Sequence, residues 1–298
     1  MLKRTLTALL LIPPVVYLIG WSPKWLFVLA VSFAIVLALR EYFGLCAAMG
    51  FKAFSWIGFG AGILLCLAFA YPPLYLSDAV TSVLLVFLLL IATWAMRPNT
   101  DLKDYLAAIS VTMFGILYIG FSLALLVPIR FGQHSIAGHR FIETHELIPE
   151  VGSQPILLLF LVIWAGDICA YLVGRSFGRT PFFPRISPRK TWEGSLAGLA
   201  GSLVAAWAFQ HWFWKIADVR TVILLAAWIA VAGQVGDLVE SAIKRGANQK
   251  DSGTLLPGHG GFLDRIDSLL FAAPALWLGL GFSYALFPPT LFTLGFPS

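Results

Sequence analysis

Charged side chains are scarce in this sequence. Asp, Glu, Lys and Arg make up only 12% of its 298 residues, whereas 59% of the residues are hydrophobic. The mean hydropathy of +0.85 excludes an ordinary soluble domain and indicates a polytopic membrane protein. No low-complexity linker and no direct or inverted repeat is visible, which disfavours transporter architectures built from symmetric halves.

Several chemical motifs are also missing. Cys46, Cys66 and Cys169 lie within or beside apolar stretches and no pair has metal-ligand spacing, so we interpret them as buried apolar residues and exclude a disulfide framework. The sequence has no His-Glu-x-x-His zinc motif, no dinucleotide fingerprint and no Gly-x-Ser-x-Gly near a plausible triad. Residues 174–180 fail as a phosphate-binding loop, because the glycines are one residue too close and Arg replaces Lys.

Long apolar stretches are abundant instead. A helix needs about 20 largely apolar residues to cross a bilayer, and about nine segments meet this requirement. We therefore predict an all-α polytopic integral membrane protein with about nine transmembrane helices. The predicted spans cover roughly residues 4–20, 25–42, 54–71, 79–96, 105–129, 155–174, 193–214, 220–245 and 264–287.

The basic residues predict the orientation. With the N-terminus in the cytoplasm, 15 of the 20 Lys and Arg residues fall on the cytoplasmic side, as the positive-inside rule requires. This one-sided charge suits anionic lipid headgroups or phosphates better than nucleic acid. We expect a five-helix region at 1–130, an outer loop at 131–154 and a four-helix region at 155–298 that carries a cytoplasm-facing site. His134, His139 and His145 in the outer loop match no common zinc spacing.

One cluster of charges lies between the last two apolar stretches. On a helix, Asp237, Ser241 and Lys244 share one face, and Asp264 and Asp267 share a face of the next helix. A short connection rich in Gly and Pro joins the two helices and would bring their ends together. Charge beside a bilayer is costly, so such a cluster indicates a functional site.

The residue types in this cluster suit phosphate chemistry. Carboxylates of Asp237, Asp264 and Asp267 are hard oxygen ligands for Mg²⁺ bridging to a polyphosphate. Basic side chains would neutralise phosphate charge during an in-line displacement; these are Lys244, Arg245, Lys250 and Arg265. The alternative is a juxtamembrane charge run that snorkels into the headgroups, but it does not account for the carboxylates and the glycine-rich turn.

A second cluster precedes the first. Asp167 is an ionisable residue inside an apolar helix, which indicates function unless it pairs with Arg175 or Arg179 as a structural ion pair. Basic and polar residues continue into the following cytoplasmic loop, where Lys190 could hold a triphosphate or only flank the membrane. The candidate binding residues of this cluster are Asp167, Tyr171, Arg175, Arg179, Ser187, Lys190 and Thr191.

The segment from Ser241 to Asp267 closely resembles the signature of the phosphatidate cytidylyltransferase (CDP-diacylglycerol synthase) family. The pattern is Ser241-x-Ile243-Lys244-Arg245-x4-Lys250-Asp251-x-Gly253-x2-Leu256-Pro257-x-His259-Gly260-Gly261-Phe262-x-Asp264-Arg265-Ile266-Asp267. Two further stretches are similar to other cytoplasmic motifs of the family: Asp167-x2-Ala170-Tyr171-x2-Gly174-Arg175 and Ser187-Pro188-x-Lys190-Thr191-Trp192-Glu193-Gly194.

The resemblance implies cytidylyl transfer from CTP to phosphatidic acid by a homodimeric enzyme of the bacterial inner membrane. It implies dependence on Mg²⁺, with K⁺ also implicated, and it matches Asp237 and Asp264 to the metal-binding aspartates, with Asp267 beside them. The predicted catalytic set is Asp237, Lys244, Arg245, Lys250, Asp251, His259, Asp264, Arg265 and Asp267. Ser241, Gly260 and Gly261 join the predicted substrate-binding residues, and Asp251 and His259 are expected to orient groups in the loop.

Three other functions are compatible with the same residues. A CTP-dependent polyprenol kinase would transfer the γ-phosphoryl group, and a CDP-archaeol synthase would use an ether lipid. An ion-coupled transporter would use Asp167 and Asp237 as an ion pathway. For the enzymes we expect a polar cavity that faces the cytoplasm among spans six to nine.

Overall fold

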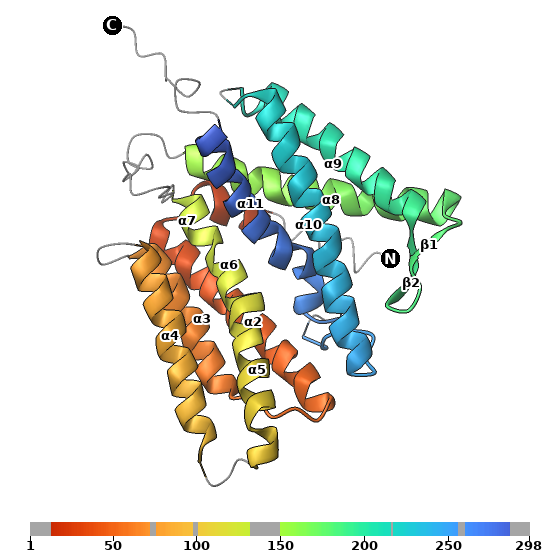
Figure 1. Cartoon of the computed structure of the whole chain (residues 1–298). Helices are drawn as coiled ribbons and strands as arrows, with labels where there is room; N and C mark the ends of the chain where they lie inside the picture. Colours follow the sequence, from red (N-terminus) through yellow and green to blue (C-terminus); the bar gives the residue numbers. More distant parts are fainter. Residues whose placement is uncertain are drawn as a thin grey trace, which may run out of the picture.

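The protein is built almost entirely of α-helices in two adjoining groups (Figure 1). The computed structural model describes residues 13–71, 76–97, 101–131, 150–215, 217–255 and 260–286. The three histidines predicted to lie in an outer loop, at positions 134, 139 and 145, are outside these ranges.

The first group follows the predicted spans of the N-terminal half. Residues 13–20 form a helix, and the elements after it are α2 (Lys24–Ala48), α3 (Ser55–Ala70), α4 (Leu76–Ala95), η1 (Leu102–Asp104), α5 (Tyr105–Gly115), η2 (Ile116–Phe121), α6 (Ser122–Ala124) and α7 (Leu126–Arg130). Segment η2 is a π-helical turn inside the predicted span 105–129. It packs closely on α3, because a Cβ on Gly120 would lie only 3.4 Å from the Cα of Gly62. Small residues at a helix crossing permit this approach.

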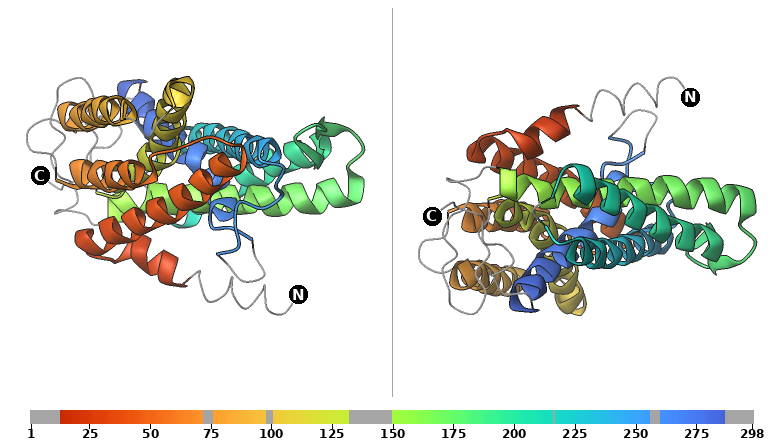
Figure 2. Two further views of the ribbon diagram at one scale, coloured as in Figure 1. Left: turned by 90° about the horizontal axis from the view of Figure 1, so that it is seen from below. Right: turned by 90° about the horizontal axis from the view of Figure 1, so that it is seen from above.

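The second group holds the remaining elements. They are α8 (Glu150–Phe177), β1 (Pro181–Phe183), β2 (Ser187–Thr191), α9 (Trp192–Trp212), α10 (Val219–Gly246), η3 (Leu263–Arg265) and α11 (Asp267–Leu286). Helices α8 and α9 run side by side, and α10 packs against both of them and against α11. Figure 2 shows α8 and α9 extending together beyond the N-terminal helices. Contacts of α7 with α8, α6 with α11 and α2 with η3 join the two groups.

The strands β1 and β2 form a small antiparallel hairpin that the sequence analysis did not predict. Pro181 pairs with Thr191 and Phe183 pairs with Ser187. The ring of Phe182 meets the indole of Trp192 edge-on, with centroids 4.4 Å apart. Prolines at 181, 184 and 188 disfavour helix in the residues before them, which leaves extended backbone here. Strands this short, with several exposed charged residues, lack the apolar alternation by which strands are recognised.

Five helices of the described residues are long and apolar enough to cross a membrane. They are Lys24–Ala48, Asp78–Ala95, Leu102–Arg130, Ser153–Phe177 and Val219–Gly246. Two shorter apolar helices are Ser55–Ala70 and Asp267–Phe282. The predicted span 193–214 corresponds to α9, which belongs to neither set. The fold is therefore that of a helical integral membrane protein.

Candidate active site

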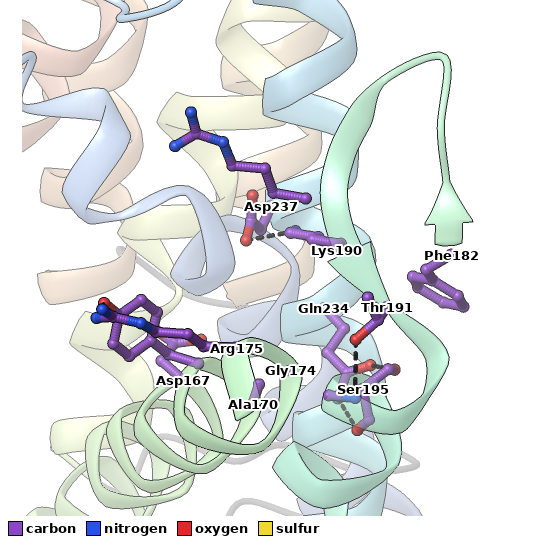
Figure 3. Close-up of a pocket in the computed structure, with 13 residues that line it drawn as sticks. Asp167, Ala170, Gly174, Arg175, Phe182, Lys190, Thr191, Ser195, Gln234 and Asp237 are labelled. Carbon is purple, nitrogen blue, oxygen red and sulfur yellow. Dashed lines mark hydrogen bonds and ion pairs between the residues drawn. The ribbon is translucent and has the colours of Figure 1, made fainter. Parts of the chain in front are cut away.

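A cavity of about 630 Å³ lies between α8, the hairpin, α9 and α10 (Figure 3). Helix α8 and the hairpin supply opposite walls: Asp167 and Arg175 come from α8, whereas Lys190 and Thr191 come from β2. The complete lining is Asp167, Ala170, Tyr171, Gly174, Arg175, Phe182, Arg189, Lys190, Thr191, Gly194, Ser195, Gln234 and Asp237. The structure thus brings Asp237 of the first cluster to one cavity with most of the second predicted cluster, whose members Arg179 and Ser187 do not line it.

The hairpin places the side chain of Lys190 in the wall of this cavity. Thr191, the last residue of β2, is also the N-cap of α9, and its Oγ1 accepts a hydrogen bond of 3.2 Å from the Gly194 N–H. This cap fixes the strand-to-helix junction next to Lys190. The Lys190 Nζ lies 2.5 Å from Oδ2 of Asp237 on α10. Both side chains are 30% exposed, so a bound anion can reach the pair.

Neutral polar groups complete the walls. The amide Nε2 of Gln234 donates to the Ser195 carbonyl over 3.0 Å, and the Ser195 hydroxyl donates back to the Gln234 amide oxygen.

On α8, Arg175 donates to the Tyr171 hydroxyl at 2.9 Å. Arg175 therefore points along its own helix to Tyr171, and the hydrogen bonds and ion pairs of the described residues include no pair between Arg175 and Asp167.

Two carboxylates, those of Asp167 and Asp237, line the cavity, and that of Asp267 lies near enough to act on both. Asp167 and Asp267 each interact electrostatically with Asp237, and Asp267 also interacts with Asp167. Lys190 acts on Asp167 as well as on Asp237. Like charges repel each other, and Lys190 offsets part of this repulsion. Asp267 starts α11, and its Oδ1 accepts a hydrogen bond of 2.6 Å from the Ser268 N–H.

A second charged set lies two turns further along α10. Lys244 Nζ is 2.6 Å from Oε2 of Glu240 and 2.7 Å from Oδ1 of Asp264. Glu240 is fully buried, and the side chain of Lys244 is only 11% exposed, so water screens these pairs little. Lys244 follows Asp237 by seven positions, or about two helical turns. This spacing places the two residues on one face of α10, about 10 Å apart along its axis.

Asp264 is held by the loop before it as well as by Lys244. Its Oδ2 accepts hydrogen bonds from the backbone N–H groups of Gly261 at 2.8 Å and Ser252 at 3.0 Å. Burial alone would raise the pKa of the Asp264 carboxyl, but the hydrogen bonds from Lys244 and from these N–H groups outweigh it and hold the pKa below its usual value. Asp264 is therefore a preorganised carboxylate.

The glycines of this loop have specific roles. Gly260 has φ = +79°, which L side chains rarely adopt, and a Cβ there would lie 3.0 Å from Asp264 Oδ2. A Cβ on Gly261 would overlap the Ser252 hydroxyl. Both predicted glycines thus allow the backbone to approach Asp264 and Ser252 closely.

Other predicted residues have structural contacts. Arg245 donates through Nε to the Ile186 carbonyl at 3.1 Å, which ties the hairpin turn to the end of α10. Ser241 donates to Asp237 over 3.4 Å. Of the remaining predicted residues, Lys250, Asp251, Arg265 and Arg179 are exposed, Ser187 opens β2, and His259 lies outside the described residues.

Several contributing residues were not predicted as site residues. Glu193 accepts hydrogen bonds from the N–H groups of Arg179 and Thr180 and so fixes the turn into the hairpin. Gln234 and Ser195 line the cavity, and Glu240 pairs with Lys244. Glu41, on the distant helix α2, contacts the loop that holds Asp264. Position within or next to an apolar helix was the available signal for Glu41 and Glu240.

The donor chemistry at the cavity fits Mg²⁺. No three His, Cys, Asp or Glu side chains among the described residues are close enough to form a complete metal site. Mg²⁺ is usually bound through one or two carboxylates together with waters and substrate phosphates, so a complete protein cage is not expected for it. Of the predicted ligands, Asp237 lines the cavity and Asp267 interacts with it, so the carboxylate oxygens that Mg²⁺ prefers are present there.

Comparison with known proteins identifies one family for residues 2–282. The model of the cytidylyltransferase family matches residues 2–282. The chain is similar to a phosphatidate cytidylyltransferase from Synechocystis, with 36% identity over 270 residues that cover 85% of this chain and 87% of the relative. It is also similar to a phosphatidate cytidylyltransferase from Bacillus subtilis, with 45% identity over 139 residues, 47% of this chain and 51% of that protein.

A plant relative extends the similarity. Phosphatidate cytidylyltransferase 5 from Arabidopsis thaliana, a chloroplastic protein, is 34% identical over 267 residues, which cover 83% of this chain and 64% of the plant protein. The match of the family model includes every described element from α2 to η3 and most of α11. Because the family model matches residues 2–282 and the Synechocystis relative aligns with 85% of the chain, the chain belongs to the cytidylyltransferase family.

Proposed function

We propose that this protein is a phosphatidate cytidylyltransferase, which converts CTP and phosphatidic acid to CDP-diacylglycerol and pyrophosphate. The observation that carries the proposal is the cavity itself. Cationic Arg175, Arg189 and Lys190 line it together with the carboxylates of Asp167 and Asp237. Its volume of about 630 Å³ is in the usual range for small-molecule sites. The names of the relatives support the same activity.

The position of the cavity suits one water-soluble and one lipid substrate. Helix α8, which forms one wall of the cavity, also exposes apolar side chains. Ile168 and Leu172 are 60% and 57% exposed, as expected for a helix that faces lipid. The acyl chains of phosphatidic acid can therefore stay in the bilayer along α8. Its phosphate can then reach the basic residues of the hairpin, which also attract the triphosphate of CTP.

In the proposed reaction, a phosphate oxygen of phosphatidic acid attacks the α-phosphorus of CTP in line. A new phosphorus–oxygen bond forms while the bond between the α-phosphorus and the bridging oxygen breaks, and its electron pair leaves with pyrophosphate. The attacking phosphate is already anionic at neutral pH, so no strong general base is needed. The residues act by positioning and by neutralising charge, and Lys190 is placed to exchange Asp237 for a phosphate oxygen.

We propose Asp237, Asp264 and Asp267 as the residues that hold Mg²⁺. The ion supplies neutralisation and alignment of the triphosphate oxygens when bound. Asp237 and Asp267 belong to the carboxylate group at the cavity, whereas Asp264 accepts its hydrogen bonds from Lys244 and the loop. Asp264 could contribute an oxygen to Mg²⁺ while it keeps its hydrogen bond to Gly261, because each carboxylate oxygen has two lone pairs. A role for K⁺ rests on the family resemblance.

The membrane arrangement is a further part of the proposal. We place the N-terminus and the cavity on the cytoplasmic side of a bacterial inner membrane, with about nine spans and a homodimeric assembly. The asymmetry of the basic residues supports the direction, because 15 of the 20 Lys and Arg residues then face the cytoplasm. The hairpin residues Arg185, Arg189 and Lys190 belong to that side.

Cytidine-labelled CTP tests the function directly. Purified protein is mixed with vesicles that contain phosphatidic acid, the corresponding ether-lipid phosphate or a polyprenol, with and without Mg²⁺, and label in the lipid fraction is compared with released pyrophosphate. We expect equal amounts of both, only with phosphatidic acid and Mg²⁺. Release of CDP with a phosphorylated polyprenol would establish the kinase instead, and preference for the ether lipid would establish the archaeol enzyme. Absence of any lipid product would contradict all three enzymes.

A matched pair of variants controls this assay. Asp237→Asn removes a carboxylate of the cavity and should abolish lipid labelling. Asp104→Asn removes the carboxylate that pairs with Lys52 at 3.2 Å, outside the cavity, and should leave labelling unchanged. Equal activity of both variants would contradict the assignment of the site.

A further inference from the structure

Glu41 is a buried carboxylate in the C-terminal third of a mostly apolar helix. It lies on α2 and is only 6% exposed. Its oxygens accept hydrogen bonds from the Ser252 hydroxyl at 2.9 Å and from the backbone N–H groups of Phe262 at 2.9 Å and Leu263 at 2.8 Å. All three partners donate hydrogen bonds to Glu41. An ionised carboxylate suits this position, because it can only accept hydrogen bonds. A helix of the N-terminal group thus binds the loop between α10 and α11.

These hydrogen bonds lead directly to Asp264. Phe262 and Leu263 are the two residues before Asp264, so Glu41 fixes the backbone on which Asp264 stands. Ser252 provides a second route, because its hydroxyl donates to Glu41 and accepts from the Asp264 N–H at 3.3 Å. The Ser252 N–H also donates to the Asp264 carboxylate. Displacement of the Glu41 side chain would therefore disturb both of these connections to Asp264, although Lys244 and the Gly261 N–H would still contact its carboxylate.

The loop is also shaped to enclose Glu41. A Cβ on Gly253 would lie 2.6 Å from Glu41 Oε1, and a Cβ on Gly261 would lie 2.5 Å from Glu41 Oε2. Real Cβ contacts are essentially never this short. Two glycines of the connection thus leave room for one carboxylate from another part of the chain. Close packing on both sides and three hydrogen bonds leave Glu41 one arrangement.

We propose that Glu41 is a positioning residue for the cytidylyl transfer: it holds the loop and, through it, the carboxylate of Asp264. The inference rests on the proposed function for its kinetic part, whereas its structural part does not depend on the reaction. Glu41 lies among the N-terminal helices and does not line the cavity, so it acts through the loop.

Three substitutions separate a positioning role from simple space filling. Glu41→Gln keeps the volume but places an N–H₂ donor against a backbone donor, whereas Glu41→Asp is shorter but still only accepts. Loss of a charge-assisted hydrogen bond predicts a fall in kcat of about 10- to 100-fold for Glu41→Gln. The KM for CTP should change less than kcat, because the basic lining of the cavity is untouched. Glu41→Asp should retain more activity than Glu41→Gln, and Glu41→Ala should be the weakest.

The order of the variants decides between the two roles. If Glu41 only fills space, Glu41→Gln keeps normal kcat per folded molecule and Glu41→Asp is the more damaged variant. That order would overturn the proposal. Asp104→Asn, which removes a carboxylate outside both charged sets, serves as the unchanged control.

Amide hydrogen exchange tests the same inference without the reaction. In Glu41→Gln, exchange at residues 260–266 should accelerate at least tenfold, while peptides from α3 stay protected as in the parent protein. Combination with Ser252→Ala should add little further acceleration, since both residues act through one hydrogen-bonded unit. Unchanged exchange would overturn the inference. If the parent protein made no CDP-diacylglycerol but the exchange shift occurred, only the proposed function would fail.

Discussion

The ammonium of Lys190 lies 2.5 Å from the carboxylate of Asp237 and joins strand β2 to helix α10 in the wall of the cavity. Each side chain is 30% exposed, and partly exposed ion pairs contribute only about 0–1 kcal/mol to stability. The pair is therefore weak enough to separate when a phosphate group enters, and it keeps both groups in place until then.

Substitution of Lys190 should separate activity from stability. We expect Lys190→Met to lower kcat/KM for CTP by about 10²–10³-fold, the usual loss when one stabilising group at developing charge is removed. Thermal unfolding in detergent should change little. Lys190→Arg keeps the charge but not the ammonium geometry, so it should recover only part of the activity. Parent-like kinetics of Lys190→Met would exclude a role for Lys190 in binding phosphate.

Substitution of Lys244, unlike that of Lys190, should lower the stability of the protein. Lys244→Met leaves the buried carboxylate of Glu240 without its ion pair and removes a partner of Asp264. Breaking a buried pair from one side typically costs about 3–5 kcal/mol. Lys244→Met should therefore unfold at a clearly lower temperature than Lys190→Met, and added Glu240→Gln should restore part of the loss. A parent-like unfolding temperature would contradict the buried network.

Acid should weaken the loop through Asp264. Because the folded-state pKa of Asp264 is lowered, its ionised form stabilises the fold. This contribution is complete above the unfolded-state pKa of about 3.9 and is lost as the pH falls through the lower folded-state pKa. In metal-free buffer, the stability difference between the parent and Asp264→Asn should be constant from about pH 5 to 7 and shrink below about pH 4. If the stability difference between the parent and Asp264→Asn instead grew as the pH fell, the hydrogen bonds assigned to the Asp264 carboxylate would be wrong.

Two glycines offer a test of loop packing. A Cβ on Gly261 would overlap the Ser252 hydroxyl and approach Glu41 Oε2 to 2.5 Å, whereas a Cβ on Gly44 would have nothing within 4 Å. Gly261→Ala should lower stability by about 1–3 kcal/mol and also reduce turnover. Gly44→Ala, in an open helical position, should leave both unchanged or raise stability slightly. Equal behaviour of the two variants, measured by unfolding and by the lipid-labelling assay, would rule out tight packing around Gly261.

The helices could be predicted because their apolar runs and end signals agree. The predicted span 220–245 corresponds to α10 at Val219–Gly246, where Asp218 caps the first turn through the Thr221 N–H. Helix α8 begins earlier than predicted, at Glu150 in place of residue 155, and contains Pro155 in its second turn. The number of spans is harder to predict, since length and hydropathy decide only five helices of the described residues.

The candidate site was predictable where residues share a local pattern. Asp167, Lys190 and Asp237 line one cavity, which the predicted spans six to eight and the hairpin form without a residue of the ninth. Glu41 was missed although it follows the same rule as Asp167, because the predicted span ended at residue 42 and Glu41 lay at its border. Helix α2 continues to Ala48, and the partners of Glu41 are up to 222 residues away. Spacing along the sequence carries no information about such a contact.

The contact between α2 and the loop has a consequence for any divided form of the protein. A piece that starts near Glu150 would contain every residue that lines the cavity, but its glycine loop would enclose a space that no carboxylate of that piece fills. Such a fragment should be inactive when produced alone and should recover only with the missing helices supplied as a second polypeptide. The early helices would then be an indispensable component of the enzyme in addition to holding it in the bilayer.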